Sequence, residues 1–494
     1  MNPRNKAVFE IYRPLRNLLN GFNTLDSLYV IWGYSRNYTF NYDFPNDIEK
    51  LRGFNPKEKD LHNRKYYGGL FDHELEFLLR EIIINGDFRK KSASLKSAKY
   101  SIKLVNYLRG PLSDGLSKTI NMKDNLFLEF NRLAHNQFDW QMGYSIKTVF
   151  RYNLIYSDAA VSKIIFDKLG LTPNQILLIG SLLFSYTGTN FITPLITSST
   201  TDLITVEMIN IYLSHFATTI KEVRQELKEY QQINENLLYT YNPLCARPII
   251  LEKDGMICPM PMLIFWQMTS GIYYCICDSV NFSHAFGDSF QKYVGTVLEK
   301  SCDNGNFQIY PEETFGKQHK RTSDWMVSDI DSILFIECKT KRMRLDSKTE
   351  LDSNNGLNND LKLMAGFITQ LYKTYLDYKL GLYPSIGYDE SKTFIPLVLT
   401  LEDWGVNFNH LIMETITNLT EIEFQKANLD TSLLKEFPFN IKCASEFEND
   451  IQLINELGIK DYFEKCRTNQ ITEYSKNFKF KDIYKDEYSK IFPN

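Results

Sequence analysis

The chain has 494 residues and a net charge of −4, and it is 43% hydrophobic and 23% charged. These proportions exclude a disordered chain, and the small net charge means that nucleic-acid binding would depend on a local basic patch. At about 150 residues per domain, the length predicts more than one domain. The eight cysteines are scattered without a CxxC pair, so we expect free thiols rather than a zinc site.

The start of the chain and its most apolar stretch bear on location. The first residues, MNPRNKAVFEIYRPLRN, lack the apolar segment of a secretory signal. Residues 176–186 are apolar, but they are too few to cross a bilayer and Gly180 and Ser181 interrupt them. We therefore expect a cytoplasmic protein with no membrane partner.

Residues 1–240 are expected to form a mostly helical domain, which would recognise a substrate or a partner. Apolar residues recur at helical spacing over 75–84. Thr172 is the expected N-cap of a further helix, and Gln175 can complete a capping box with it. Residues 211–235 are apolar early and charged later, which predicts one long helix.

The pattern changes over 241–280, which we predict to be a hairpin and a connecting segment. Four prolines punctuate it, and residues 249–258 predict two short strands with a turn at Asp254-Gly255. Residues 281–300 then carry apolar side chains at helical spacing, which predicts a long helix.

The central pattern is the stretch RTSDWMVSDIDSILFIECKTKRMR, residues 321–344. Its two apolar runs, WMV and ILFI, are joined by a short polar connection, which predicts a β-hairpin. Asp324 precedes the first run, and Glu337-Cys338-Lys339 follows the second. Because strand side chains alternate between faces, Glu337 and Lys339 share one face, and Asp324 can approach them across the hairpin.

Two carboxylates and an amine at one end of a sheet suit the hydrolysis of a phosphodiester. Asp324 and Glu337 supply the oxygen ligands that Mg²⁺ prefers, and the backbone carbonyl of Cys338 is the natural extra ligand. Lys339 can orient a metal-bound water or neutralise the charged transition state. The alternative is an amphipathic hairpin with solvated charges at its ends. The apolar run directly before Glu337 argues against it, because buried charges need a partner or a metal.

The pattern Asp324 … Glu337-Cys338-Lys339 resembles the PD-(D/E)xK nuclease superfamily, the fold of many restriction enzymes, with Ser323 in place of the motif's proline. The resemblance implies an α/β, restriction-endonuclease-like core over 281–403. This core has the order αβββαβ, with a mixed sheet flanked by helices. It also implies Mg²⁺ as cofactor, with Mn²⁺ able to substitute.

Three residues are candidate accessory groups. The first core helix of the superfamily often gives an acidic residue to the metal site, but Gln291 stands at that position, with Glu299 as one substitute. The third candidate is Gln370. RecB-like members have three residues between the Gln and the Tyr of a Q-x-x-x-Y pattern on the second core helix, whereas this chain has four residues between Gln370 and Tyr375. For all three, the alternative is an exposed polar face.

The other expected elements of the core follow from periodicity and turn residues. They are a strand at 307–310, a polar loop at 346–359, a helix at 360–380 and a buried strand at 394–401. Because proline cannot donate to a strand ladder, pairing of the strand at 394–401 should begin after Pro396. Residues 404–494 are expected to be a helical C-terminal extension.

Basic residues crowd around the hairpin, and we take four of them as candidates for binding nucleic acid: Lys320, Arg321, Lys341 and Arg342. The alternative is a solvated charge run. We expect a Mg²⁺-dependent endonuclease that prefers DNA to RNA, because most of the superfamily cuts DNA. The resemblance to large single-chain nucleases implies bacterial anti-phage defence. The rival is a nuclease-fold protein that binds without cutting, or a scaffold subunit of a larger complex. A protein partner or a homo-oligomer stays open.

Overall fold

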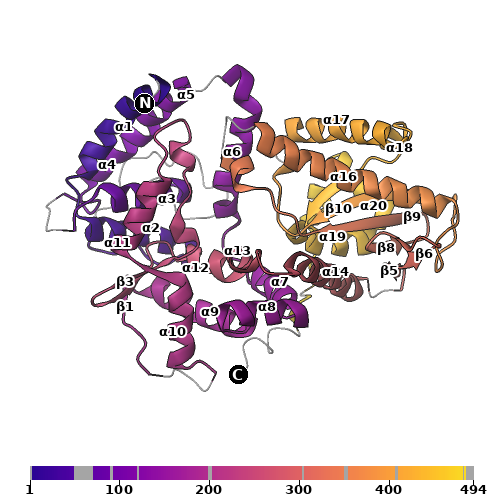
Figure 1. The fold of residues 1–494 in the computed structure, drawn as a ribbon, viewed down its shortest axis with the longest axis horizontal. Helices are drawn as coiled ribbons and strands as arrows, with labels where there is room; N and C mark the ends of the chain where they lie inside the picture. Colours follow the sequence, from indigo (N-terminus) through magenta and orange to yellow (C-terminus); the bar gives the residue numbers. More distant parts are fainter. Residues whose placement is uncertain are drawn as a thin grey trace. The chain divides into compact units, whose positions relative to one another are not determined.

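The computed structural model describes residues 3–48, 70–88, 93–119, 122–198, 203–302, 305–349, 354–406, 410–481 and 483–485. The chain divides into two compact units. Each combines helices with a sheet, so the protein is a mixed α/β protein (Figure 1). Unit 1 comprises residues 1–153, 162–279 and 349–351, and unit 2 comprises residues 154–161, 280–348 and 352–494.

The helices of the first part of the chain make up most of unit 1. The expected capping box is present: the hydroxyl of Thr172 accepts the backbone N–H of Gln175, whose side chain accepts the backbone N–H of Thr172. The helices are α1 (Pro3–Leu19), α2 (Thr24–Phe40), α3 (Asp72–Asn85), α4 (Ala98–Tyr107), α5 (Ser113–Thr119), α6 (Met122–Met142), α7 (Ile146–Tyr156), α8 (Ala159–Leu169), α9 (Pro173–Thr189), α10 (Val206–Phe216), α11 (Ile220–Tyr230), α12 (Met262–Trp266) and α13 (Ile272–Ile276).

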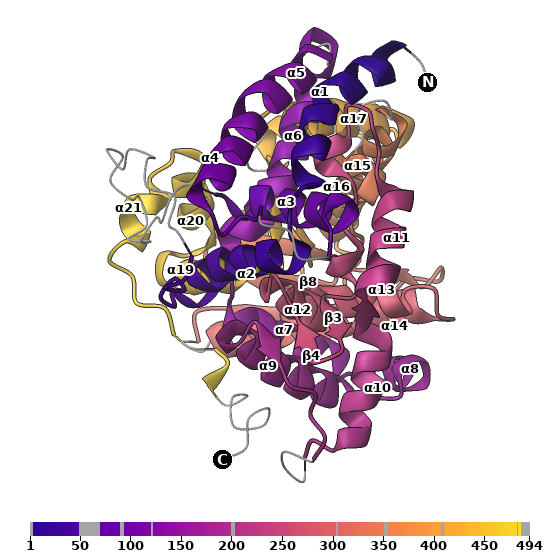
Figure 2. The same ribbon diagram turned by 90° about the vertical axis from the view of Figure 1, so that its left-hand side faces the viewer.

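Unit 1 also contains a four-stranded sheet in the order β1 (Ile192–Thr193), β4 (Gly255–Ile257), β3 (Ile249–Glu252) and β2 (Ala217–Thr219). The predicted hairpin is β3–β4, and it forms the middle of this sheet. The prediction of one helix over 211–235 is wrong. Residues Ala217–Thr219 pair in parallel with β3, and α11 begins afresh with Thr219 as its N-cap (Figure 2).

None of the described helices is by itself both long and apolar enough to cross a bilayer. The pair α8 and α9, bent by 62°, reaches the required length and composition only when the two are taken together.

Unit 2 is built on a five-stranded sheet in the order β11-β10-β9-β8-β5. The first three strands along the chain are antiparallel neighbours, whereas β9, β10 and β11 are parallel. The strands are β5 (Gln308–Pro311), β8 (Trp325–Ser328), β9 (Ser332–Lys339), β10 (Thr393–Thr400) and β11 (Asn440–Cys443). Between β5 and β8 in the chain, β6 (Thr314–Phe315) and β7 (Lys320–Arg321) form a separate small hairpin.

Helices cover both faces of this sheet (Figure 1). On one face α16 (Asn354–Lys379) packs on β9 and β10, with α17 (His410–Lys426) beside it. On the other face lie α14 (Phe282–Ser301), α19 (Ala444–Leu457) and α20 (Ile459–Arg467). The shorter helices are α15 (Leu345–Thr349), α18 (Leu433–Glu436) and α21 (Ile471–Ser475).

The order α14, β5, β8, β9, α16, β10 is the predicted sequence of helix, three strands, helix and strand. Two expectations are wrong. Residues 346–359 do not form one loop, because α15 ends at Thr349 and α16 begins at Asn354; residues 350–353 lie outside the described part. The extension after residue 404 is not wholly helical, since β11 joins the sheet.

Pro396 has a different effect on each side of β10. The ladder with β9 runs through it, with Pro396 opposite Phe335, so pairing does not wait until after the proline. The ladder with β11 begins only at Leu397. The missing N–H of proline is therefore tolerated where the neighbouring strand has not yet begun.

The contact between α14 and β8 gives a test of this arrangement. A Cβ added to Gly295 would overlap the indole ring of Trp325, whereas one added to Gly287, on the same helix, would meet no atom within 4 Å. We expect Gly295→Ala to destabilise unit 2 by about 1–3 kcal/mol in urea denaturation, because overpacking outweighs the helix preference of alanine. Gly287→Ala should be neutral or slightly stabilising. Equal effects of the two changes would contradict the packing described.

Candidate active site

The predicted hairpin is formed by β8 and β9, which are antiparallel with Trp325 opposite Ile336. Its polar turn is structural. The carboxylate of Asp329 accepts the backbone N–H of Ser332 at 2.8 Å, and its second oxygen accepts the backbone N–H of Ile459, at the start of α20, at 2.8 Å. The turn therefore fixes the hairpin and α20, and the three residues predicted to be catalytic lie at the opposite end of the two strands.

At that end the structure brings together the three residues predicted to be catalytic. The Oδ2 atom of Asp324 accepts the backbone N–H of Cys338 at 2.6 Å. Lys339 Nζ donates to Oε1 of Glu337 at 2.5 Å, and it lies 4.9 Å from the ring centroid of Phe367 on α16. Glu337 and Lys339 therefore share the α16 face of the sheet, as strand alternation predicts.

Burial decides how each of these groups behaves. Glu337 is only 2% exposed, and its Oε2 atom makes no hydrogen bond within the described part of the chain. The side chain of Lys339 is 21% exposed, so the site opens to solvent on the amine's side. A buried carboxylate oxygen without a donor is costly unless a cation completes it.

The electrostatics of the site agree with this geometry. Burial, followed by the charge of Glu337, raises the pKa of Asp324 to about 7. Burial also raises the pKa of Glu337, and the nearby ammonium of Lys339 offsets this only in part. For Lys339 burial acts to lower the pKa, but the two carboxylates outweigh it and the pKa lies above its usual value. Burial therefore disfavours the charged forms of both carboxyl groups, and a bound cation would stabilise them.

The available donors fit a hard divalent cation, since they are carboxylate and carbonyl oxygens. Within the described ranges, no three His, Cys, Asp or Glu groups converge closely enough to hold a metal ion. An ion here would therefore be held by Asp324, Glu337, the carbonyl of Cys338 and water. The side chain of Cys338 points to the opposite face of β9 from Glu337 and Lys339, so only its backbone carbonyl is a candidate ligand.

The accessory candidates on α14 lie on the far face of the sheet. The Gln291 side chain donates to the backbone carbonyl of Asp324 at 3.4 Å, and the Gln291 carbonyl accepts the indole N–H of Trp325 at 2.9 Å. Gln291 thus supports the backbone that carries Asp324. Glu299 is exposed two turns further along α14, and the structure does not bring it to the carboxylates.

Gln370 is better placed, because α16 covers the face that bears Glu337 and Lys339. Phe367 lies three residues before it and Thr374 four residues after it, so the three share one side of the helix. Phe367 lies beside the ammonium of Lys339, and Thr374 Oγ1 lies 3.2 Å from Ser323 Oγ. The exposed Gln370 therefore stands at the margin of the site.

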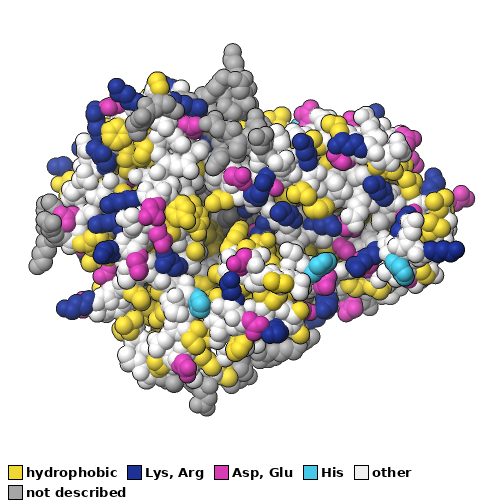
Figure 3. All heavy atoms as spheres, in the orientation of Figure 1, with side chains coloured by type: hydrophobic (Ala, Val, Ile, Leu, Met, Phe, Trp, Pro, Cys, Tyr) yellow, Lys and Arg dark blue, Asp and Glu magenta, His cyan; other side chains and the backbone are white. Residues whose placement is uncertain are grey.

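The four basic candidates differ in exposure. Lys320, Arg321 and Lys341 are exposed, with Lys320 paired to Asp377 at 3.0 Å. Arg342 is only 5% exposed and is paired with Glu402 at 3.0 Å, so it is part of the folded framework and not of a nucleic-acid surface. Elsewhere on the face seen in Figure 3, basic and acidic side chains are interspersed.

One acidic residue near the site, Glu312, was missed by the sequence reasoning. It directly follows β5, whose Pro311 pairs with Trp325. Its charge raises the pKa values of Asp324, Glu337 and Cys338, with burial as the larger cause in each case. The sequence signal for this residue is the acidic pair Glu312-Glu313 directly after the predicted strand. That signal does not show that Glu312 lies near Asp324, which follows from the register of β5 and β8.

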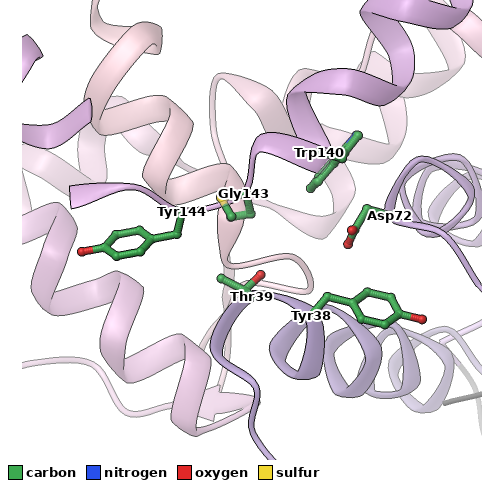
Figure 4. Close-up of a pocket in the computed structure, with 7 residues that line it drawn as sticks. Tyr38, Thr39, Asp72, Trp140, Gly143 and Tyr144 are labelled. Atoms are coloured by element: carbon green, nitrogen blue, oxygen red, sulfur yellow. The ribbon is translucent and has the colours of Figure 1, made fainter. Parts of the chain in front are cut away.

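Unit 1 contains a separate pocket of about 140 Å³ (Figure 4). Its aromatic rings are held by packing: the Trp140 ring lies 4.3 Å from that of Trp266, and the hydroxyl of Tyr38 donates to the carbonyl of Leu70. Figure 4 shows the rings of Tyr38 and Tyr144 pointing away from one another. We assign no role to this pocket, which is lined by Tyr38, Thr39, Asp72, Trp140, Gly143, Tyr144 and Met262.

Comparisons of the chain with protein-family models, with curated proteins and with solved structures found no match. The geometry of Asp324, Glu337 and Lys339 and the D…ExK resemblance are therefore the basis for assigning a function.

Proposed function

We propose that the protein is a metal-dependent nuclease that hydrolyses phosphodiester bonds, and that unit 2 is a restriction-endonuclease-like core. One observation carries the proposal. A carboxylate that is almost fully buried, Glu337, shares its site with Asp324 and Lys339 and has one oxygen without a hydrogen bond. Such an arrangement is unfavourable for stability alone and is typical of a site that binds a cation.

The chain's own groups have distinct roles in this proposal. Asp324, Glu337 and the carbonyl of Cys338 would hold Mg²⁺, or Mn²⁺ in its place, which when bound supplies positive charge at the phosphate and a water of lowered pKa. Lys339 remains an ammonium and acts as a donor to a phosphate oxygen or to the attacking water, not as a general base. The ion pair with Glu337 holds Lys339 in position.

Substrate binding falls to the exposed basic residues near this end of the sheet. Lys320, Arg321 and Lys341 are exposed and can contact phosphates on either side of the bond that is cut. We propose DNA before RNA, and an endonuclease acting in bacterial anti-phage defence, from the superfamily resemblance.

The test is Mg²⁺-dependent nicking of supercoiled plasmid by the full-length protein, with single-stranded DNA and RNA as parallel substrates. We expect conversion of plasmid to open circles with Mg²⁺ or Mn²⁺ and none with EDTA. If RNA alone is cut, the choice of DNA is wrong.

A second candidate is a nuclease-fold protein that binds nucleic acid without cutting it, or a scaffold subunit of a larger complex. The neutral Gln291, at the position where the superfamily often has an acid, favours it. Retention of plasmid in a gel-shift assay with no cleavage of any of the three substrates would support this candidate over the nuclease.

A further inference from the structure

Three acidic residues lie at the same end of three neighbouring strands of unit 2: Glu312 directly follows β5, Asp324 directly precedes β8, and Glu337 lies within β9. In the β8–β9 ladder Trp325 is opposite Ile336, so the next step of the register places Asp324 opposite Glu337. In the β5–β8 ladder Pro311 is opposite Trp325, so the next step places Glu312 opposite Asp324. Directly opposed residues of antiparallel strands point to the same face, so extending both registers by one step beyond the paired residues sets the three carboxylates side by side on one face. We call this set of three the row.

The surroundings of Glu312 leave its carboxylate available. It is half-buried, and within the described part of the chain its side chain makes a long ion pair with Arg321, at 3.4 Å. Its neighbour Glu313 differs, because the carboxylate of Glu313 accepts the Ser385 hydroxyl at 2.7 Å. Glu312 therefore faces the site while Glu313 is held by another segment.

A second observation points to a ligand in the same row. Oε2 of Glu337 is buried and makes no hydrogen bond in the described part of the chain, so the row contains an acceptor without a donor. Three neighbouring carboxylates repel one another unless a cation or its water molecules lie among them. Because the described carboxylates do not converge tightly enough for all three to touch one ion, the outermost would act through water.

We propose that Glu312 is the third acid of this site and that, from the end of β5, it positions the water shell of the divalent cation held by Asp324 and Glu337. This inference rests on the proposed function. Glu312 is a positioning residue that supplies, from the end of β5, the negative charge that Gln291 on α14 cannot supply. Glu312 would accept hydrogen bonds from water bound to the cation, and its ion pair with Arg321 keeps that arginine beside the site.

The test measures Mn²⁺ binding to the full-length protein, without nucleic acid, by the electron paramagnetic resonance signal of free Mn²⁺. We expect Glu312→Gln to weaken binding by about 10–100-fold, the usual effect of removing a group that supports a metal ligand. Glu312→Asp keeps the charge and should recover part of the loss. Glu313→Gln is the matched control and should change binding by less than about 2-fold. Circular dichroism of each variant reports whether the fold is retained.

Asp324→Asn in the same assay separates this inference from the proposed function. If Asp324→Asn loses Mn²⁺ binding while Glu312→Gln binds like the wild type, the role of Glu312 is wrong and the proposed site stands. If both variants bind Mn²⁺ like the wild type, the ion is not held in this row and both proposals fall. A loss with Glu313→Gln equal to that with Glu312→Gln would also overturn the role of Glu312.

Discussion

Asp324→Asn is expected to lower the rate of plasmid cleavage by about 10³-fold or more while the protein stays folded. Asparagine is almost the same size as aspartate and keeps an oxygen that can accept the backbone N–H of Cys338, which Asp324 binds at 2.6 Å. What it loses is the negative charge that would help to hold the cation. The measurement is the initial rate of nicking at saturating Mg²⁺.

The control is Asp331→Asn, at the other end of the same hairpin, where Asp331 is exposed and accepts the hydroxyl of Ser332. It should cleave at the wild-type rate. Wild-type cleavage by Asp324→Asn, with protein of equal purity, would remove Asp324 from the catalytic site.

Lys339→Met is expected to destabilise unit 2 by about 3 kcal/mol at pH 8, in addition to abolishing cleavage. It removes the partner of a buried carboxylate, since Glu337 is 2% exposed and its Oε1 binds Lys339. Hydrogen exchange of the β8–β10 amides, followed by mass spectrometry, reports the loss locally.

The pH dependence of this loss has a definite sign. Burial raises the pKa of Glu337 in the native protein even with Lys339 present, and removal of the ammonium raises it further. The native variant then holds a proton more tightly than the unfolded chain, so stability falls as pH rises above the ordinary carboxyl pKa. The deficit should be smaller at pH 5 than at pH 8, and Glu337→Gln in the same chain should restore most of it. A deficit that is independent of pH and unaffected by Glu337→Gln would show that Lys339 acts only through packing.

The central hairpin could be predicted because the residues that specify it are adjacent in the sequence. The two apolar runs around a polar turn specify β8 and β9, and alternation along β9 places Glu337 and Lys339 on one face. The capping box at Thr172 is equally local. Each of these features depends on a few adjacent residues.

The errors concern features that depend on distant parts of the chain. The break between α10 and α11 arises because Ala217–Thr219 pair with β3, and the short β11 forms because β10 offers it an edge. Arginine is a common phosphate-binding residue, but Arg342 is buried and paired with Glu402. Glu312 lies beside Asp324 because of two strand registers, which the sequence around Glu312 does not specify. Gln291 and Glu299 belong to α14, which packs on the face of the sheet opposite to Glu337 and Lys339.

We expect one divalent ion to bind between Asp324 and Glu337. The anomalous diffraction signal of Mn²⁺ in crystals of the full-length protein would locate this ion. One peak is expected within coordination distance of both carboxylates and of the carbonyl of Cys338. A well-ordered site with no peak there at millimolar Mn²⁺, or with Lys339 filling the space between the two carboxylates, would contradict it.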